Sequence, residues 1–192
     1  MEPARILVVC TGNVCRSPFT ERVLTARLRA FGLDESLVLV RSAGTQAMVG
    51  DPMTEPTRRL VTDHDAEPDG FVSRQLVPAM VEEADLVLAL TREHRTIAVQ
   101  MFPRANRYTF TLRQLERLLA LAAAELELSD GDDPRKRVQA VIAAAAAKRG
   151  FEALSGPELD DVVDPYRASR STYATAASQM LPGIDALAAA LS

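Results

Sequence analysis

Short apolar runs alternate along the chain with segments whose apolar residues recur at helical spacing. The first run, residues 6–10, is rich in β-branched side chains, which is typical of a parallel strand buried on both faces. Further runs predict strands at 37–40, 85–90 and 107–110, and helical segments separate them at about 18–31, 55–62, 78–83 and 93–101. This alternation predicts an α/β fold with a four-stranded parallel sheet and helices on both of its faces.

Residues 113–159 depart from this alternation. Leucines and alanines at helical spacing predict an amphipathic helix from about Leu115 to Leu126, a turn at 129–134 and a second helix from about 135 to 148. We interpret the segment as a helical hairpin or partly mobile insertion within one domain of residues 1–192, as expected for this length. A last helix is predicted after Tyr166, and Pro182-Gly183 is expected to kink or interrupt it.

Composition argues against several classes of protein. The 22 basic and 26 acidic side chains give a net charge of −4, which disfavours a general nucleic-acid binder. No stretch approaches the ~20 apolar residues of a membrane span, and the first residues lack the basic start and long apolar run of a signal peptide. Two cysteines are too few for the disulfide scaffold of a secreted domain. We therefore expect a soluble cytoplasmic protein.

The two histidines, His64 and His94, stand alone in the sequence and show no metal-ligand spacing. We therefore expect no metal site and interpret both histidines as surface or structural residues. Arg92, Arg95 and Arg170 are likewise interpreted as solvated side chains.

The candidate chemistry lies in the segment Cys-Thr-Gly-Asn-Val-Cys-Arg-Ser-Pro that begins at Cys10. A cysteine at a strand end starts a loop that closes on Arg16, whose planar fork matches two phosphate oxygens. Backbone N–H groups of such a loop can form an anion nest, and the following helix adds its positive end. Gly12 allows a tight turn, and Asn13 tolerates a left-handed conformation. These features favour a nucleophilic thiolate at Cys10, to which Ser17 can donate a hydrogen bond. The alternative is a structural loop with two small buried cysteines.

Residues 9–18 closely resemble the signature of the low-molecular-weight protein tyrosine phosphatases. The resemblance continues in Ser-Ala-Gly at 42–44, Ser-Arg-Gln-Leu at 73–76, Ala-Asp-Leu at 84–86 and Val-Asp-Pro-Tyr at 163–166. It covers the chain from about residue 4 to 112 and from about 162 to the end, and the residues between look like an insertion. The resemblance implies a four-stranded parallel sheet flanked by helices, and it implies no cofactor.

The same resemblance assigns roles to individual residues. Cys10 would attack phosphorus and form a phosphocysteine intermediate, and Asp164 would protonate the leaving phenolate and later activate water. Tyr166 would stack on the substrate ring, and Ser42 would support the loop through Asn13 or Ser17. The phosphate would be bound by Arg16 and the loop residues Thr11, Gly12, Asn13, Val14, Cys15 and Ser17.

The second cysteine, Cys15, has two interpretations. In many members of the family that it resembles, a second loop cysteine pairs reversibly with the nucleophile and protects it from overoxidation. The other interpretation is a small residue that packs the loop. We favour protection, because both sulfurs belong to one compact loop.

The residues also indicate a branch of the family. The apolar loop at 45–50 and the segment at 164–170 look like the bacterial exopolysaccharide-linked branch, whose usual substrates are autophosphorylated tyrosine kinases. Val14 is apolar as in tyrosine-specific members, whereas relatives acting on phosphoarginine carry threonine there. An arsenate reductase coupled to a small thiol and a non-catalytic phosphotyrosine-binding module stay open as alternatives. The module would be expected to lack Cys10 or Asp164, and both are present.

Overall fold

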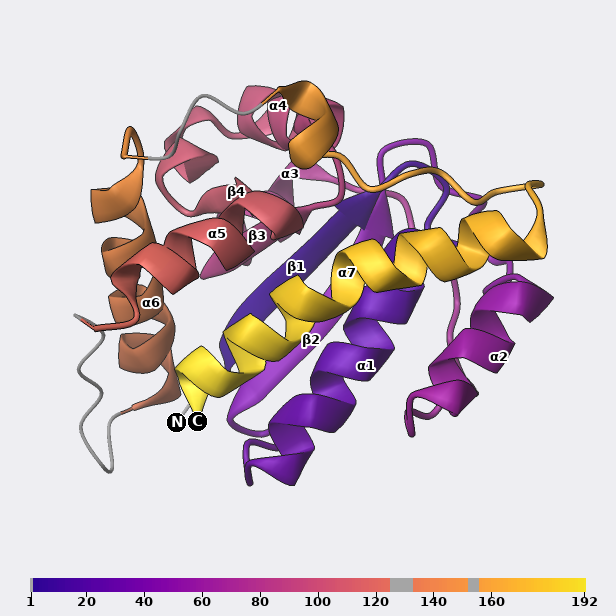
Figure 1. Cartoon of the computed structure of the whole chain (residues 1–192), viewed down its shortest axis with the longest axis horizontal. Helices are drawn as coiled ribbons and strands as arrows, with labels where there is room; N and C mark the ends of the chain where they lie inside the picture. Colours follow the sequence, from indigo (N-terminus) through magenta and orange to yellow (C-terminus); the bar gives the residue numbers. More distant parts are fainter. Residues whose placement is uncertain (1, 125–132, 152–155) are drawn as a thin grey trace.

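A computed structural model describes residues 2–124, 133–151 and 156–192 (Figure 1). Its centre is one sheet of four parallel strands: β1 (Ala4–Cys10), β2 (Val38–Gly44), β3 (Leu86–Ala89) and β4 (Thr109–Thr111). The order β2-β1-β3-β4 places β1 in the interior, with Cys10 opposite Gly44 at its carboxyl end. The predicted four-stranded parallel sheet is therefore confirmed. In such sheets, ligands bind beyond the carboxyl ends of the strands, near the point where the strand order reverses.

Alternation of side chains along β1 divides the core into two layers. Ile6 and Val8 point into the larger layer, and Leu7 and Val9 point into the smaller one on the opposite face. The strand is apolar at every one of these positions because helices cover both faces. This explains why a continuous run, rather than an alternating pattern, marks the strand in the sequence.

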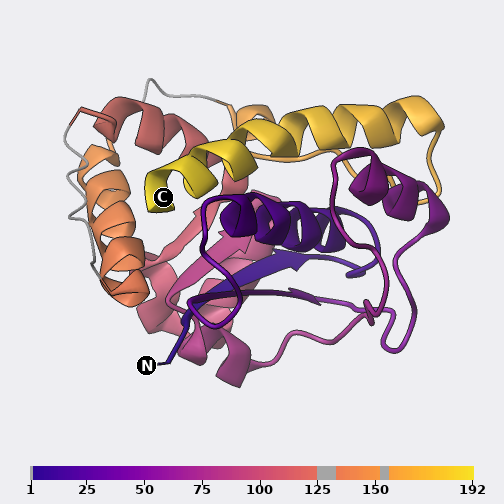
Figure 2. The same cartoon turned by 90° about the horizontal axis from the view of Figure 1, so that it is seen from below.

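The larger core layer lies under α1 (Arg16–Ala30) and α7 (Arg170–Leu191), and α2 (Glu55–Asp63) packs beside them (Figures 1 and 2). The smaller layer is covered by α3 (Pro78–Glu83) and α4 (Arg92–Met101). A short 3₁₀ helix, η1 (Pro103–Arg107), follows α4. Strand β4 therefore begins at Thr109, later than the predicted 107, because η1 includes Arg107.

The next two helices belong to the same core. Leu115 and Leu118 of α5 (Leu112–Ala122) are fully buried, as are Val138 and Val141 of α6 (Pro134–Lys148). Helix α5 packs on α7, and α6 packs on α5, at the side of the molecule beyond β4 (Figure 1). The predicted helix end at Leu126 and most of the predicted turn at 129–134 lie outside the described residues. A second 3₁₀ helix, η2 (Pro157–Leu159), precedes the segment that leads to α7.

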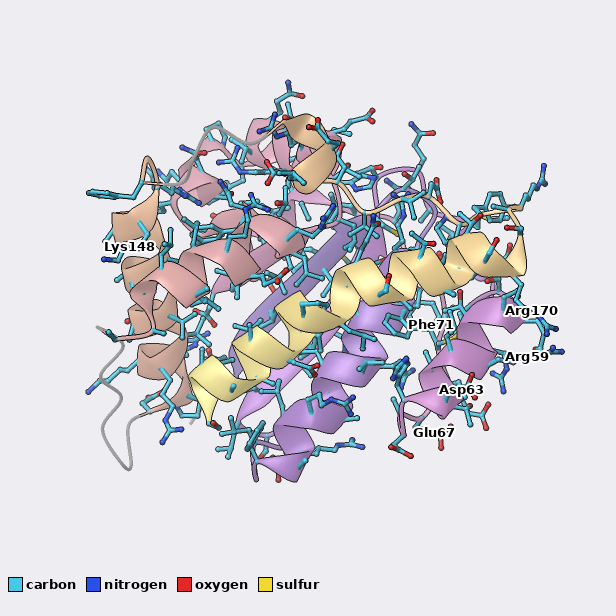
Figure 3. The ribbon with its side chains drawn as sticks, in the orientation of Figure 1. Arg59, Asp63, Glu67, Phe71, Lys148 and Arg170 are labelled. Atoms are coloured by element: carbon cyan, nitrogen blue, oxygen red, sulfur yellow. The ribbon has the colours of Figure 1, made fainter. Side chains whose placement is uncertain are left out.

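The expected interruption at Pro182-Gly183 is wrong, because α7 runs unbroken from Arg170 to Leu191. Pro182 lies on the exposed face of the helix, where the carbonyl that loses its N–H partner can bind water. Gly183 lies on the buried face, where a Cβ would come within 2.8 Å of Leu112. Close packing of α7 on α5 therefore holds the helix through the proline. At the other end, Arg170 projects outward at the start of α7 (Figure 3).

Within the described parts of the chain, no helix combines the length and the apolar character that a membrane crossing requires.

Candidate active site

The loop between β1 and α1 turns its carbonyl groups outward. These oxygens accept hydrogen bonds from the segment after β2, in the pairs Cys10 O–Thr45 N (2.9 Å), Thr11 O–Gln46 N (3.0 Å), Gly12 O–Met48 N (3.0 Å) and Val14 O–Thr54 N (2.9 Å). Gly44 permits this contact, since a Cβ there would lie 2.4 Å from the carbonyl oxygen of Thr11. With these carbonyls engaged outside, the peptide N–H groups of the loop are left available to an anion on the concave side, as in an anion nest. The sequence did not show that residues 45–54 would hold the loop.

Asn13 carries the left-handed turn of the loop, with φ of 54°, whereas Gly12 does not adopt a positive φ. The expectation for Asn13 is confirmed, and the turn does not require the conformational freedom of Gly12. The asparagine side chain is fully buried behind the loop, where its Oδ1 accepts a hydrogen bond of 2.9 Å from the backbone N–H of Arg74.

The sulfur of Cys10 is buried and lies 2.9 Å from the hydroxyl oxygen of Ser17. Asn13 Nδ2 donates to that same hydroxyl oxygen over 2.9 Å. Because the oxygen of Ser17 accepts from the amide, its proton is free to be donated to the sulfur. The expected contact between Ser17 and Cys10 is thus present, in a geometry that lets the hydroxyl donate to a thiolate.

A buried polar chain continues from Asn13 to a carboxylate. Asn13 Nδ2 also donates to the hydroxyl oxygen of Ser42 over 2.8 Å, and Ser42 in turn donates to Glu21 Oε2 over 2.6 Å. Burial raises the pKa of Glu21, and the hydrogen bond from Ser42 partly opposes that shift. Ser42 therefore contacts Asn13, as the resemblance implied, while Glu21 was not anticipated. Its position was a usable signal, since Glu21 lies one helical turn after Ser17 on the same face of α1.

The guanidinium of Arg16 is buried and held at three points. Nη1 donates to Val162 O over 3.1 Å, Nη2 donates to Thr11 Oγ1 over 3.4 Å, and Nη2 lies 3.0 Å from Asp164 Oδ2. The Asp164 carboxylate is half exposed. The fold thus places side by side two residues that are far apart in the sequence, at the carboxyl end of β1.

A cavity of about 160 Å³ opens at this point. Cys10, Thr11, Gly12, Val14, Cys15 and Arg16 line its loop side, and Gln46, Met48, Asp164 and Tyr166 complete it. Most of the residues selected from the sequence therefore meet at one cavity. The side chains of Asn13, Ser17 and Ser42 are fully buried, and they form a supporting layer behind the loop.

His94 is not a surface residue. It is buried, with Nε2 lying 2.9 Å from Thr11 Oγ1 and Nδ1 lying 2.9 Å from the side-chain oxygen of Thr91, the residue that caps α4. Burial and the nearby Arg16 guanidinium lower the pKa of His94 from 6.5 to about 4, so the ring is neutral at pH 7. Its contact with the loop was missed because the residues involved are far apart in the sequence.

Cys15 lines the cavity, and its sulfur also belongs to a polar cluster with Thr54 and Tyr173. Its sulfur is 3.4 Å from the hydroxyl of Tyr173 and 3.5 Å from that of Thr54, and both cysteines are free thiols. Burial raises the pKa of Cys15, and burial together with the Cys15 contact raises that of Tyr173 to about 12. These contacts fit a packing residue, and burial, which outweighs the opposing effect of the hydrogen bonds from Tyr173 and Thr54, favours the thiol over the thiolate at Cys15. Within the described residues, no group of three His, Cys, Asp or Glu side chains has a metal-binding arrangement.

Comparison with known proteins identifies the family. The model of the low molecular weight phosphotyrosine protein phosphatases matches residues 5–148, which extends past residue 112 into the segment between the signature regions. The low molecular weight protein-tyrosine-phosphatase Etp of Escherichia coli K12 is 35% identical over 109 residues, or 57% of this chain and 69% of that protein. The protein-arginine-phosphatase of Bacillus subtilis 168 is 38% identical over 110 residues, or 57% and 70%.

A solved structure shows the same fold. The crystal structure of the Erwinia amylovora tyrosine phosphatase AmsI matches with a TM-score of 0.66 at 22% identity, covering 97% of this chain and 93% of that chain. The chain belongs to the low molecular weight phosphotyrosine protein phosphatase family.

Proposed function

We propose that this protein hydrolyses phosphotyrosine in proteins through a phosphocysteine intermediate. The observation that carries the proposal is the loop around the buried Cys10 sulfur, four of whose carbonyls bond outward to the segment at 45–54. Such a loop directs N–H groups and the Arg16 fork toward the three non-bridging oxygens of a phosphoryl group. The Ser17 hydroxyl stabilises the thiolate when it is the attacking and, later, the leaving group.

In the first step, the Cys10 thiolate attacks phosphorus, the bond from phosphorus to the phenolic oxygen breaks, and protonated Asp164 gives its proton to that oxygen. In the second step, the Asp164 carboxylate takes a proton from water, the water oxygen attacks phosphorus, and the thiolate leaves with release of phosphate. Asp164 Oδ2 lies 3.0 Å from Arg16 Nη2. A bound phosphoryl group competes for that donor, which frees the carboxyl group to face the leaving oxygen.

The side chains at the cavity favour a phenyl ester over phosphoarginine. Val14, Met48 and Tyr166 offer apolar and aromatic contacts that suit a phenyl ring. A phosphoarginine substrate brings a polar guanidinium, and its N–H groups need acceptors that Val14 cannot supply. The relatives include both kinds of phosphatase, so the choice rests on these side chains.

The substrate is proposed to be a phosphorylated protein in the cytoplasm, with a bacterial tyrosine kinase as the first candidate. This finer assignment rests on the resemblance of the segments at 45–50 and 164–170 to the exopolysaccharide-linked branch. Gln46 and Met48 of the first segment line the cavity, where they would contact residues flanking the phosphotyrosine.

The deciding experiment is steady-state hydrolysis of matched phosphotyrosine and phosphoarginine peptides, with arsenate reduction by a small thiol assayed in parallel. We expect turnover of phosphotyrosine, none with Cys10→Ser, and trapping of phosphate on Cys10 after rapid acid quench. Val14→Thr should raise the ratio of phosphoarginine to phosphotyrosine turnover relative to the wild type. Preferred hydrolysis of phosphoarginine, or efficient arsenate reduction without peptide hydrolysis, contradicts the proposal.

A further inference from the structure

The arginine side chains at a second cavity form an excess of positive charge. This cavity, of about 390 Å³, lies between α4, the start of α5 and the residues that follow α6. It is lined by Arg92, Arg95, Thr96, Thr111, Gln114, Arg149, Gly150 and Asp160. We propose that this cavity binds a small anion that carries more than one phosphate group.

The single carboxylate among the lining residues is already engaged. Asp160 Oδ2 lies 2.7 Å from Arg92 Nε, and its Oδ1 pairs with Arg117. Across the part of the chain that the structure describes, no carboxylate pairs with Arg95 or Arg149. Arginines elsewhere do have such partners, as in the pairs Arg29–Glu35 and Arg58–Asp69. Arg95 and Arg149 are therefore two arginines without a carboxylate partner that line the same cavity, in a chain whose net charge is −4.

Neutral groups fix both guanidinium groups in place. Arg95 Nε donates to Thr109 O over 3.2 Å, and its Nη2 donates to Asn106 Oδ1 over 2.6 Å. Arg149 donates to Thr109 O over 2.9 Å and to Asn106 O over 3.1 Å. Carbonyl oxygens orient a guanidinium but do not neutralise it. Both guanidinium groups are therefore already ordered, and binding of an anion would not carry the entropic cost of immobilising two flexible side chains.

The surroundings of Arg95 and Arg149 disfavour two positive charges without a counterion. The Arg149 guanidinium lies 3.9 Å from the centre of the Phe110 ring. Burial lowers the pKa of both Arg95 and Arg149, and the charge of Asp160 only partly opposes this shift at Arg95. The charge of Arg95 lowers the pKa of Arg149 further, which reports repulsion between the two groups. An entering anion relieves that repulsion in a partly desolvated site. At the same wall, Thr111 Oγ1 accepts from Gln114 N, so its hydroxyl proton is available to donate to the anion.

Phosphate is the chemical class that fits these donors. Arginine forks match phosphate oxygens in bidentate geometry, and three of them at one cavity suit more than one phosphate group. The volume is more than twice that of the cavity at Cys10. Two sources supply such an anion: a free metabolite, or a second phosphate on the substrate protein.

The cavity is joined to the Asp164 segment through Arg92. Its backbone N–H donates to Asp161 Oδ1 over 2.7 Å, and its side chain pairs with Asp160. The same segment continues through Val162, whose carbonyl accepts from Arg16, to Asp164. An anion that takes Arg92 from Asp160 would shift this segment and alter turnover. This effect on turnover rests on the proposed function, whereas the binding itself does not.

The test is calorimetric titration of the full-length protein with pyrophosphate at low ionic strength. Two binding events are expected, one at the Cys10 loop and one in the cavity. Arg149→Gln should weaken the cavity event about tenfold or more, because a charged hydrogen-bonding partner is lost. Arg104→Gln is the matched control, since Arg104 is exposed on η1 and does not line the cavity.

Thermal unfolding shows which variants are folded, and Arg95→Gln replaces Arg149→Gln if the latter is not. A single event that disappears in Arg16→Ala overturns the proposal, and so does equal weakening in Arg104→Gln and Arg149→Gln. A doubly phosphorylated peptide that binds the cavity while pyrophosphate does not would assign the site to the substrate protein. Calorimetry measures binding without turnover. If pyrophosphate binding depends on Arg149 but the protein does not hydrolyse phosphotyrosine, the proposed function is refuted and the proposed anion site is not.

Discussion

The buried His94 should make the stability of this protein fall as the pH decreases from neutral. Its pKa is lowered from 6.5 to about 4 in the folded protein by burial and by Arg16. Between these two values the unfolded chain binds a proton that the folded protein rejects. Stability is therefore complete above pH 6.5 and is lost as the pH falls toward 4.

The magnitude follows from the two pKa values. Each pKa unit corresponds to about 1.4 kcal/mol, so the full effect of His94 on the free energy of unfolding is about 3 kcal/mol. Between pH 7 and pH 5, where most small domains stay folded, about 2 kcal/mol of this should appear. That is a large part of the total stability of a typical domain.

The assay is urea unfolding of the wild type and of His94→Gln at several pH values between 7 and 5. Glutamine keeps a polar side chain next to Thr11 but does not titrate, so the variant should lose about 2 kcal/mol less than the wild type over this range. Carboxylates that titrate, Glu21 among them, are common to both proteins and cancel in the comparison. His64→Gln, the other histidine variant available in the chain, is the matched control for the loss of a histidine. Parallel curves for the wild type and His94→Gln would refute the reasoning.

Three further outcomes test the proposed chemistry. Asp164→Asn should reduce kcat for phenyl phosphate roughly 10²–10⁴-fold and for p-nitrophenyl phosphate much less, because the better leaving group needs less protonation; wild-type rates on both esters would remove Asp164 from the mechanism. Arg16→Lys should lower kcat/KM for either ester roughly a hundredfold or more, since one ammonium cannot reproduce the contacts to Val162, Thr11 and Asp164, and near-normal efficiency would contradict the phosphate-binding role. After mild peroxide and then reductant, Cys15→Ser should recover less activity than the wild type if Cys15 resolves oxidised Cys10, and equal recovery would make Cys15 a packing residue.

The sequence predicted those parts of the fold that local pattern determines. The strand that ends at Cys10 could be recognised because β1 is apolar at consecutive positions. The loop could be recognised because turn-forming Gly and Asn, the anion-binding Arg16 and the helix-starting Ser-Pro follow one another. The left-handed turn at Asn13 belongs to the same class of local information. The family resemblance then brought in Asp164, which no local pattern distinguishes from the other acids of the chain.

The parts that were missed depend on contacts between distant segments. His94 becomes a neighbour of Thr11 only because β3 pairs with β1, and Glu21 meets Ser42 only because α1 crosses β2. Pro182 suggested a break by a local rule, and packing around Gly183 overrode that rule. Arg95 was expected to be solvated, and its bonds to Asn106 of η1 and Thr109 of β4 form only in the folded chain.

The outward carbonyl bonds of the Cys10 loop have a consequence for how the site comes into existence. Their donors, from Thr45 to Thr54, follow β2 and reach the loop only after that strand has paired with β1. A nascent chain or fragment ending at residue 35 therefore contains every residue of the signature. It still lacks the hydrogen-bond donors from Thr45 to Thr54 that hold the loop in its shape. Formation of this long-range contact carries the entropic cost of closing the intervening chain. The recovery of phosphate affinity during refolding therefore reports when β2 pairs with β1. This recovery should occur later than the formation of helix α1.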